Sequence, residues 1–258
     1  AALAGIDTME LLYRADCMRE GCASCVPAHD NPGAWLGAVM GSLARQGRDK
    51  LTLVTSPSVS GFGLWVEQLI AESLGKEGKG IVPVAGEPHP ASPKTYGDDR
   101  LFVYLRLEGD RDEGSDREVA ELEAAGLPLV RLELRDRYDI GGEFFRWELA
   151  TAVAGAVLGL NPFDQPDVQR AKDSTDAVMQ EYERTGSLPE AEVSATFDGL
   201  LDQARPGDYL AIMAFLRQTP PVDDALQAIR ARVMREHGVA TTLGYGPRFL
   251  HSTGQLHK

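Results

Sequence analysis

Apolar positions recur along this chain with two periods, one typical of strands and the other of helices. Short apolar or alternating runs predict strands at residues 50–55, 101–107, 129–134, 209–216 and 240–243. Longer segments with apolar residues three and four positions apart predict helices at residues 31–46, 62–74, 113–125, 144–158, 164–183, 190–204 and 222–237. Residues 78–93 are rich in glycine and proline and are expected to form a loop.

The alternation of strands with helices predicts an α/β fold with a mainly parallel sheet covered on both faces. Residues 1–30 are expected to be a helical tail and linker, and residues 31–258 to form one domain. In such folds ligands bind at the carboxyl ends of the strands, where the serine-rich loop 56–61 follows the first strand.

Charge and composition exclude some classes of partner. The formal net charge of -13 argues against nucleic acid, because binding to its phosphates requires clustered lysine and arginine. A small phosphorylated sugar needs only one local cationic pocket and stays open. No apolar run approaches the ~20 residues that cross a bilayer. The chain lacks a signal peptide and begins without methionine, so it is interpreted as a piece of a longer cytoplasmic protein.

A cluster of cysteine and histidine in the expected linker raises the question of a metal. Cys17, Cys22, Cys25 and His29 have a spacing compatible with zinc, and the cysteines overlap one iron–sulfur pattern. The number of cysteines is odd, which argues against a complete disulfide framework. The chemistry considered below calls for no metal. We therefore expect neither a metal nor a cofactor.

Three segments carry candidate chemistry. The glutamate motif, residues 72–76, reads Glu-Ser-Leu-Gly-Lys and closes a long amphipathic helix. The lysine motif, residues 161–172, begins Asn-Pro-Phe-Asp-Gln and ends at Lys172. The histidine motif, residues 245–257, contains Gly-Pro-Arg followed by His251. A carboxylate can act as a base between neighbouring carbons, and histidine titrates near neutrality.

Together these motifs resemble the C-terminal half of glucose-6-phosphate isomerase, whose sugar isomerase (SIS) fold is a three-layer αβα sandwich. The resemblance implies that Glu72 is the base that moves a proton through an enediol. It implies that Lys172 and His251 open the sugar ring, and that Gln165 contacts substrate near the phosphate. Asn161 and Asp164 are expected to shape the turn and cap the helix.

The order of the motifs departs from ordinary members, because the histidine motif here follows the lysine motif. That order resembles the isomerase part of bacterial bifunctional transaldolase/glucose-6-phosphate isomerase. The resemblance implies a sugar-phosphate substrate, a homodimer, and a missing N-terminal SIS half, with a transaldolase domain as a further partner. The phosphate loop and the enediolate arginine of that half are not found here, although Ser56 and Ser58 could offer hydroxyls to a phosphate.

Each assignment has a simpler alternative. Glu72 could be a solvated helix-end carboxylate, Lys172 a surface lysine, and the serines a turn with a helix cap. His251 could be a tail histidine, and His257 competes for its role. The alternative function is a sugar-phosphate-binding SIS module without catalysis. If the chain is an isomerase, Glu72 and Lys172 should line one cleft at the carboxyl edge, and His251 should reach that cleft or the equivalent one across a dimer.

Overall fold

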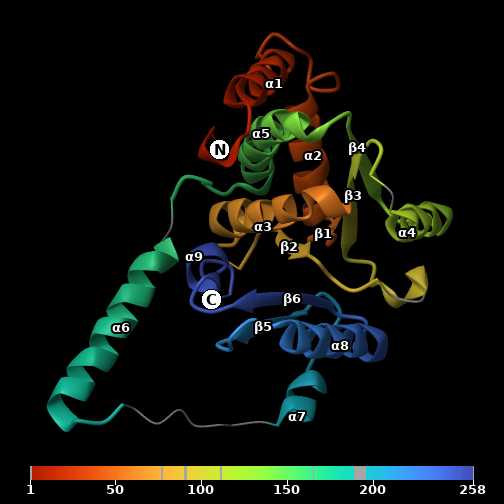
Figure 1. The fold of residues 1–258 in the computed structure, drawn as a ribbon. Helices are drawn as coiled ribbons and strands as arrows, with labels where there is room; N and C mark the ends of the chain where they lie inside the picture. The colour runs from red at the N-terminus through yellow and green to blue at the C-terminus, as the bar shows by residue number, and fades with distance from the viewer. Residues whose placement is uncertain are drawn as a thin grey trace.

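The fold is an α/β sandwich built on a parallel sheet (Figure 1). The computed structural model describes the chain apart from Ala1, Glu77, Pro90, Ala91, Arg111, Gln165, residues 189–195 and Lys258, and apart from the side chains of residues 166–171. Its strands are β1 (Lys50–Thr55), β2 (Val82–Ala85), β3 (Arg100–Leu107), β4 (Leu129–Leu134), β5 (Tyr209–Ala214) and β6 (Ala240–Tyr245). Its α-helices are α1 (Thr8–Gly21), α2 (Pro32–Arg45), α3 (Gly61–Leu74), α4 (Glu113–Ala124), α5 (Ile140–Leu158), α6 (Pro166–Thr185), α7 (Phe197–Leu201), α8 (Pro220–His237) and α9 (Phe249–Ser252).

The main sheet has the strand order β2-β1-β3-β4, and all its pairs are parallel. One face packs on α2, α3 and α5 through residues such as Leu53, Val103 and Leu132. The other face carries Phe102 and Tyr104, which pack on α4 and α8. Helices therefore cover both faces, and the expected α/β fold class is confirmed, in agreement with a SIS-type sandwich.

A capping side chain and small residues in the sequence explain how the helices begin and how closely they pack. Asn31 caps α2, because its Oδ1 accepts a hydrogen bond from the backbone N–H of Ala34 at 2.9 Å. Glycines on α2 allow close approach to α5: a Cβ at Gly37 would lie 2.4 Å from the carbonyl oxygen of Ala150. The helix α1 packs on α5 in turn. The boundary expected at residue 30 stays a prediction.

The strands β5 and β6 form a separate parallel pair beside the main sheet. A buried polar network attaches this pair to β2. Arg230 of α8 donates hydrogen bonds to the carbonyl oxygens of Gly86 and Thr241 at 2.7 and 2.6 Å. The carboxylate of Glu87 accepts from the N–H of Thr241 at 2.8 Å and from Arg100 at 2.7 Å. The C-terminal segment that follows β6 is thereby held near α3 (Figure 1).

Two sequence predictions need correction. The expected loop at residues 78–93 contains strand β2, which is short, includes Pro83 and lies at the edge of the sheet, where proline is tolerated. The expected helix at residues 190–204 is represented in the described residues by the short helix α7, while residues 189–195 lie outside them. In the described part of the chain, no helix combines the length and apolar character that a membrane span requires.

Candidate functional site

The glutamate motif lies at the C-terminal end of α3, which packs its apolar face on the sheet and ends before Gly75. Glu72 is half-buried on the last turn, and its Oε1 accepts a hydrogen bond from the side-chain amide of Gln68 at 3.1 Å. Burial raises the pKa of Glu72, while the Gln68 hydrogen bond and the nearby His251 oppose that rise. The carboxylate is therefore a stronger base than an exposed glutamate.

The histidine motif lies against the same turn through the short helix α9. The Gln68 amide that holds Glu72 also approaches the backbone carbonyl of His251, at 3.5 Å. His251 is exposed and close enough to affect the charge of Glu72. The structure thus brings Glu72 and His251 together on one open surface, with Gln68 between them.

His257, the competitor for the histidine role, has a different environment. Its Nδ1 lies 2.8 Å from the hydroxyl of Tyr209 on β5. Burial lowers the pKa of His257, so its imidazole is neutral at physiological pH. The ring of His257 also contacts the ring of Tyr209, so His257 lies at the start of β5.

The lysine motif is fastened to the glutamate motif by one buried side chain. The ammonium of Lys76 donates hydrogen bonds to the carbonyl oxygen of Asn161 at 2.8 Å and to the Oδ1 of Asp164 at 2.9 Å, and also to the carbonyl oxygen of Asp164. The Lys76 side chain is only 2% exposed. Asn161 in turn accepts from the N–H of Phe163 at 3.1 Å and donates to Asp164 at 3.2 Å. The expected turn-shaping role of Asn161 and Asp164 therefore has a physical basis.

Gly75 lets the last residues of the histidine motif approach the same point. A Cβ at this position would lie 2.6 Å from the carbonyl oxygen of Ala71 and 2.8 Å from the Cα of Leu256. A side chain larger than hydrogen would push Leu256 away. The glutamate motif, the first residues of the lysine motif and the histidine motif therefore meet at the end of α3, although about 170 residues separate the first motif from the last.

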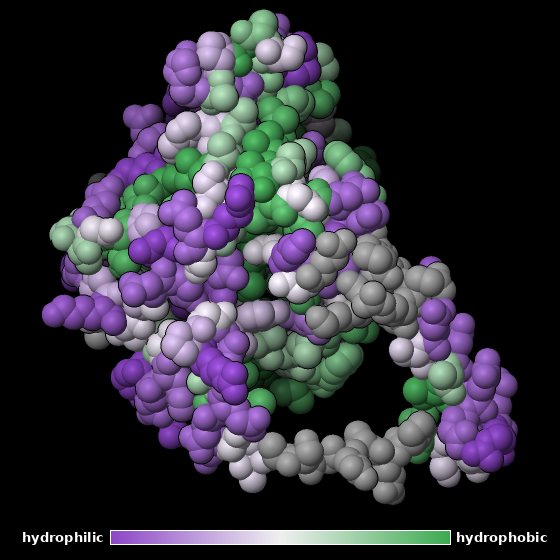
Figure 2. Space-filling view, turned by 180° about the vertical axis from the view of Figure 1, so that it is seen from behind, coloured by the Kyte–Doolittle hydropathy of each residue, from purple (hydrophilic) through white to green (hydrophobic). Residues whose placement is uncertain are grey.

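Lys172 is not brought to this point. It is an exposed residue in the second turn of α6, roughly 9 Å along the helix axis from Pro166. The helix α6 extends away from the body of the protein, as Figures 1 and 2 show. Within the described residues, no hydrogen bond or ion pair joins Lys172 to Glu72 or His251. Gln165 lies outside the described residues.

Ser56 and Ser58 lie at the opposite end of α3 from Glu72, at the carboxyl end of β1 as expected. The 14 residues of α3 separate the two ends by about 20 Å. The Ser56 hydroxyl is buried and accepts a hydrogen bond from the N–H of Leu107 at 2.9 Å. The Ser58 hydroxyl accepts from Arg137 at 3.3 Å. These serines do not share a small-molecule site with Glu72.

The position of Glu72 also corrects the expectation that the cleft lies at the carboxyl edge of the sheet. Strands β1 and β2 are parallel, so the helix between them must run back along the sheet. The end of α3 therefore lies level with the start of β2. The candidate site is beside the amino ends of these strands.

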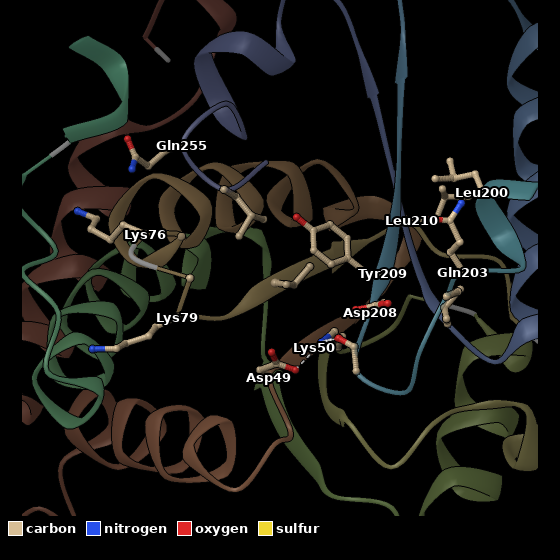
Figure 3. Close-up of a pocket in the computed structure, with 18 of the residues that line it drawn as sticks. Asp49, Lys50, Lys76, Lys79, Leu200, Gln203, Asp208, Tyr209, Leu210 and Gln255 are labelled. Carbon is tan, nitrogen blue, oxygen red and sulfur yellow. Dashed lines mark hydrogen bonds and ion pairs between the residues drawn. The ribbon is translucent and has the colours of Figure 1, made fainter. Parts of the chain in front are cut away.

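A cavity of about 790 Å³ lies behind the glutamate motif (Figure 3). Lys76 and Lys79 border it on one side, Gln203 and Leu210 border it on the other, and Tyr209 lies between them (Figure 3). The ammonium of Lys50 in its floor is engaged by Asp49 at 2.7 Å. Glu72 and His251 are not among its lining residues. The cavity adjoins the candidate site and shares Gly75 and Lys76 with it.

The cysteines of the expected linker do not form a metal centre in this structure. Cys22 is buried, whereas Cys17 and Cys25 are exposed, and none of the three is in a disulfide. His29 faces Asp30, with 3.1 Å between Nε2 and Oδ2. Among the described residues, no three histidine, cysteine or acidic side chains are grouped as a metal would require.

Two residues near the site were missed by the sequence analysis. Glu67 precedes Glu72 on the same helix, α3, but lies on its buried face. Burial raises the pKa of Glu67 to about 7. Arg248 of the histidine motif and Arg230 are the charged groups that oppose this rise. The sequence did contain a signal for Glu67, because this acidic residue occupies a position on the apolar face of the helix, between Val66 and Ile70.

The chain is similar to glucose-6-phosphate isomerases. The enzyme of Rubrobacter xylanophilus is 30% identical over 226 residues, which cover 69% of this chain and 50% of that protein. The enzyme of Enterococcus faecalis is 25% identical over 214 residues, 69% of this chain and 48% of that protein. The probable glucose-6-phosphate isomerase of Methanococcus maripaludis is 28% identical over 200 residues, 65% of this chain and 45% of that protein. The chain spans about half the length of the curated relatives it matches. No protein-family model matches it.

Proposed function

We propose that this chain provides the base and the ring-opening histidine of a glucose-6-phosphate isomerase, which interconverts glucose 6-phosphate and fructose 6-phosphate. The observation that carries the proposal is the meeting of the three motifs at the end of α3, with Glu72 beside His251. The similarity to curated enzymes of that name supports the same reaction.

The chemistry follows from what each group can exchange. Glu72 takes the proton from C2 of the open-chain aldose, and the C1 carbonyl oxygen gains a proton as the enediol forms. Glu72 then returns its proton to C1 while the O2 hydroxyl loses its own, which leaves the ketose. The raised pKa of Glu72 brings the base closer to neutrality, where it can both take and return a proton. No redox cofactor is required, because the electrons stay within the substrate.

Ring opening needs an acid at the ring oxygen and a base at the O1 hydroxyl. We assign this exchange to His251, whose exposed imidazole is on the same surface as Glu72. We also propose, from the lysine motif, that Lys172 takes part in ring opening and that Gln165 contacts the substrate near its phosphate. For Lys172 to act on the same sugar, α6 must lie differently against the rest of the enzyme, or the lysine must serve a second copy of the chain.

The remaining parts of the enzyme are also proposals. The relatives are about twice as long as the matched region, so we expect an N-terminal SIS half to supply the phosphate loop and a group that stabilises the enediolate. A transaldolase domain in the same polypeptide fits the order of the motifs, a homodimer fits the family resemblance, and a cytoplasmic location fits the odd number of cysteines.

One observation favours a second candidate, a sugar-phosphate-binding module without catalysis. Lys172 lies on a helix that extends away from Glu72 and His251, so the three groups do not form one site in this chain. The substitution Glu72→Gln in the full-length protein separates the two functions. An isomerase should lose turnover and keep sugar-phosphate binding, whereas a binding module should show no turnover in either form and equal binding in both.

A further inference from the structure

Arg248 is a cation on the candidate surface that interacts electrostatically with Glu67. It immediately precedes α9 and is exposed. Within the described part of the chain, its guanidinium has no hydrogen bond or ion pair. The other nearby cations are engaged: Lys76 by the lysine motif, and Arg230 by backbone carbonyls of β2 and β6.

The position of Arg248 follows from its backbone contact with His251 and from its electrostatic interaction with Glu67. Gln68 of α3 approaches the backbone of His251, and Glu67 of α3 interacts electrostatically with Arg248. The N–H of His251 donates to the carbonyl oxygen of Arg248 at 2.9 Å, so the two residues are one helical turn apart, about 5 Å. Arg248 therefore lies about one helical turn from His251 and within electrostatic reach of Glu67 on α3.

A hexose 6-phosphate has its reacting carbons, C1 and C2, at one end and its phosphate at the other. When C1 and C2 face Glu72 and His251, the phosphate must lie to one side of them on the open surface. A guanidinium one turn away suits that group, because its planar set of N–H donors matches two phosphate oxygens.

We propose that Arg248 binds the phosphate group of the sugar phosphate whose reacting carbons face Glu72 and His251. This assignment rests on the proposed function and adds a contact to it. Glu67 is only 3% exposed whereas Arg248 is exposed, so a phosphate can approach the guanidinium from the solvent. Arg248 thus gives this half of the enzyme an anion contact of its own.

The test uses the full-length enzyme with three variants. Arg248→Gln removes the charge and keeps a polar side chain, Arg248→Lys keeps the charge without the planar donors, and Arg232→Gln is the matched control. Arg232 is an exposed arginine of α8 whose side chain bonds Glu236 at 3.0 Å. The readouts are kcat and KM for glucose 6-phosphate, the inhibition constant of inorganic phosphate, and its Kd by calorimetry. Urea unfolding confirms that each variant is folded, which the exposure of Arg248 favours.

We expect Arg248→Gln to raise KM and both phosphate constants by about tenfold or more, the scale of one lost charge-assisted hydrogen bond. The turnover number should change little, Arg248→Lys should recover part of the loss, and Arg232→Gln should resemble wild type. Unchanged KM and phosphate constants in Arg248→Gln overturn the assignment. So does a loss confined to kcat, since Arg248 would then act on the reacting carbons.

The two hypotheses fail in different ways. If wild type isomerises the sugar and depends on Glu72, but Arg248→Gln keeps its phosphate constants, only the Arg248 assignment fails. If wild type neither isomerises nor binds glucose 6-phosphate, the proposed function fails. In that case the calorimetric Kd for inorganic phosphate still decides whether Arg248 binds the anion.

Discussion

Replacing Lys76 with methionine tests whether the glutamate and lysine motifs are held together by one ammonium. Methionine keeps much of the length of the side chain and removes all three of its hydrogen bonds. Each bond from a charged donor contributes about 1.5–3 kcal/mol. Asn161 and Asp164 are exposed, so their carbonyl oxygens recover water in the variant, and the lower value applies to each.

The carboxylate of Asp164 contributes less, because its side chain is 54% exposed and a solvated ion pair contributes at most about 1 kcal/mol. Two carbonyl contacts and this pair together give an expected loss of about 3–4 kcal/mol for Lys76→Met. Asp164→Ala leaves both carbonyl contacts in place and should cost about 1 kcal/mol. The double variant should resemble Lys76→Met alone, because the ion pair between Lys76 and Asp164 is already absent in that variant.

Urea unfolding followed by tryptophan fluorescence measures these differences. Hydrogen exchange at residues 159–164 detects loosening confined to the segment. Lys94→Met is the control, an exposed lysine outside the three motifs. The reasoning is refuted if Lys76→Met lies within about 0.5 kcal/mol of Lys94→Met with unchanged exchange, the usual range of surface substitutions. It is also refuted if Asp164→Ala costs as much as Lys76→Met.

Four further outcomes are expected. Glu72→Gln in the full-length enzyme should lower kcat by about 10²–10⁴-fold and leave sugar-phosphate binding largely intact, measured by steady-state kinetics and calorimetry; ordinary turnover contradicts the assignment of the base. The folded-state pKa of Glu67, about 7, exceeds the ordinary value of 4.5, so its neutral form is favoured on folding and stability falls as pH rises through that window. The Glu67→Gln variant has no carboxyl group to titrate, so it lacks this loss of stability. Between about pH 4 and about pH 8, urea unfolding should show the stability of the variant rising by up to about 3 kcal/mol relative to wild type. A difference between the two proteins that does not change with pH contradicts the burial argument. Gly75→Ala should cost about 1–3 kcal/mol in urea unfolding, because the new methyl group meets Ala71 and Leu256, and a neutral result means that Leu256 moves freely. The 258-residue chain alone should turn over glucose 6-phosphate poorly, since each missing electrostatic stabiliser costs several kcal/mol, and robust turnover shows that its own residues suffice.

The strands of the main sheet could be predicted where their pattern was strong. The run at 129–134 alternates between buried and exposed residues, and the run at 101–107 is almost entirely buried, as its β-branched and aromatic content indicated. Strand β2 was missed because four residues that include Pro83 have too short a pattern. Its strand conformation depends on pairing with β1, which local sequence does not reveal.

The candidate site was predictable in its residue types and less so in its geometry. Glu72 and His251 were found from motifs, and the structure places them on one surface. The local sequence of α6 does not indicate how this helix lies relative to α3, so the position of Lys172 could not be foreseen. Arg248 was noted only as part of the Gly-Pro-Arg segment, because an arginine at a helix start is common on any surface and does not by itself indicate a ligand.

The unusual order of the motifs is compatible with one site for a geometric reason. The end of α3 receives the other two motifs through contacts that do not depend on chain order: Lys76 reaches backbone carbonyls of the lysine motif, and Gly75 admits the backbone near Leu256. Neither contact requires a particular loop length between the motifs. A histidine that follows β6 in the chain can therefore face Glu72 as well as a histidine placed between the glutamate and lysine motifs. The condition is that the hydrogen bonds of Arg230 and Glu87 keep β6 beside β2. On this argument, Glu87→Gln should alter the exposure of the histidine motif in hydrogen exchange more than that of α5, even though Glu87 touches none of the three motifs.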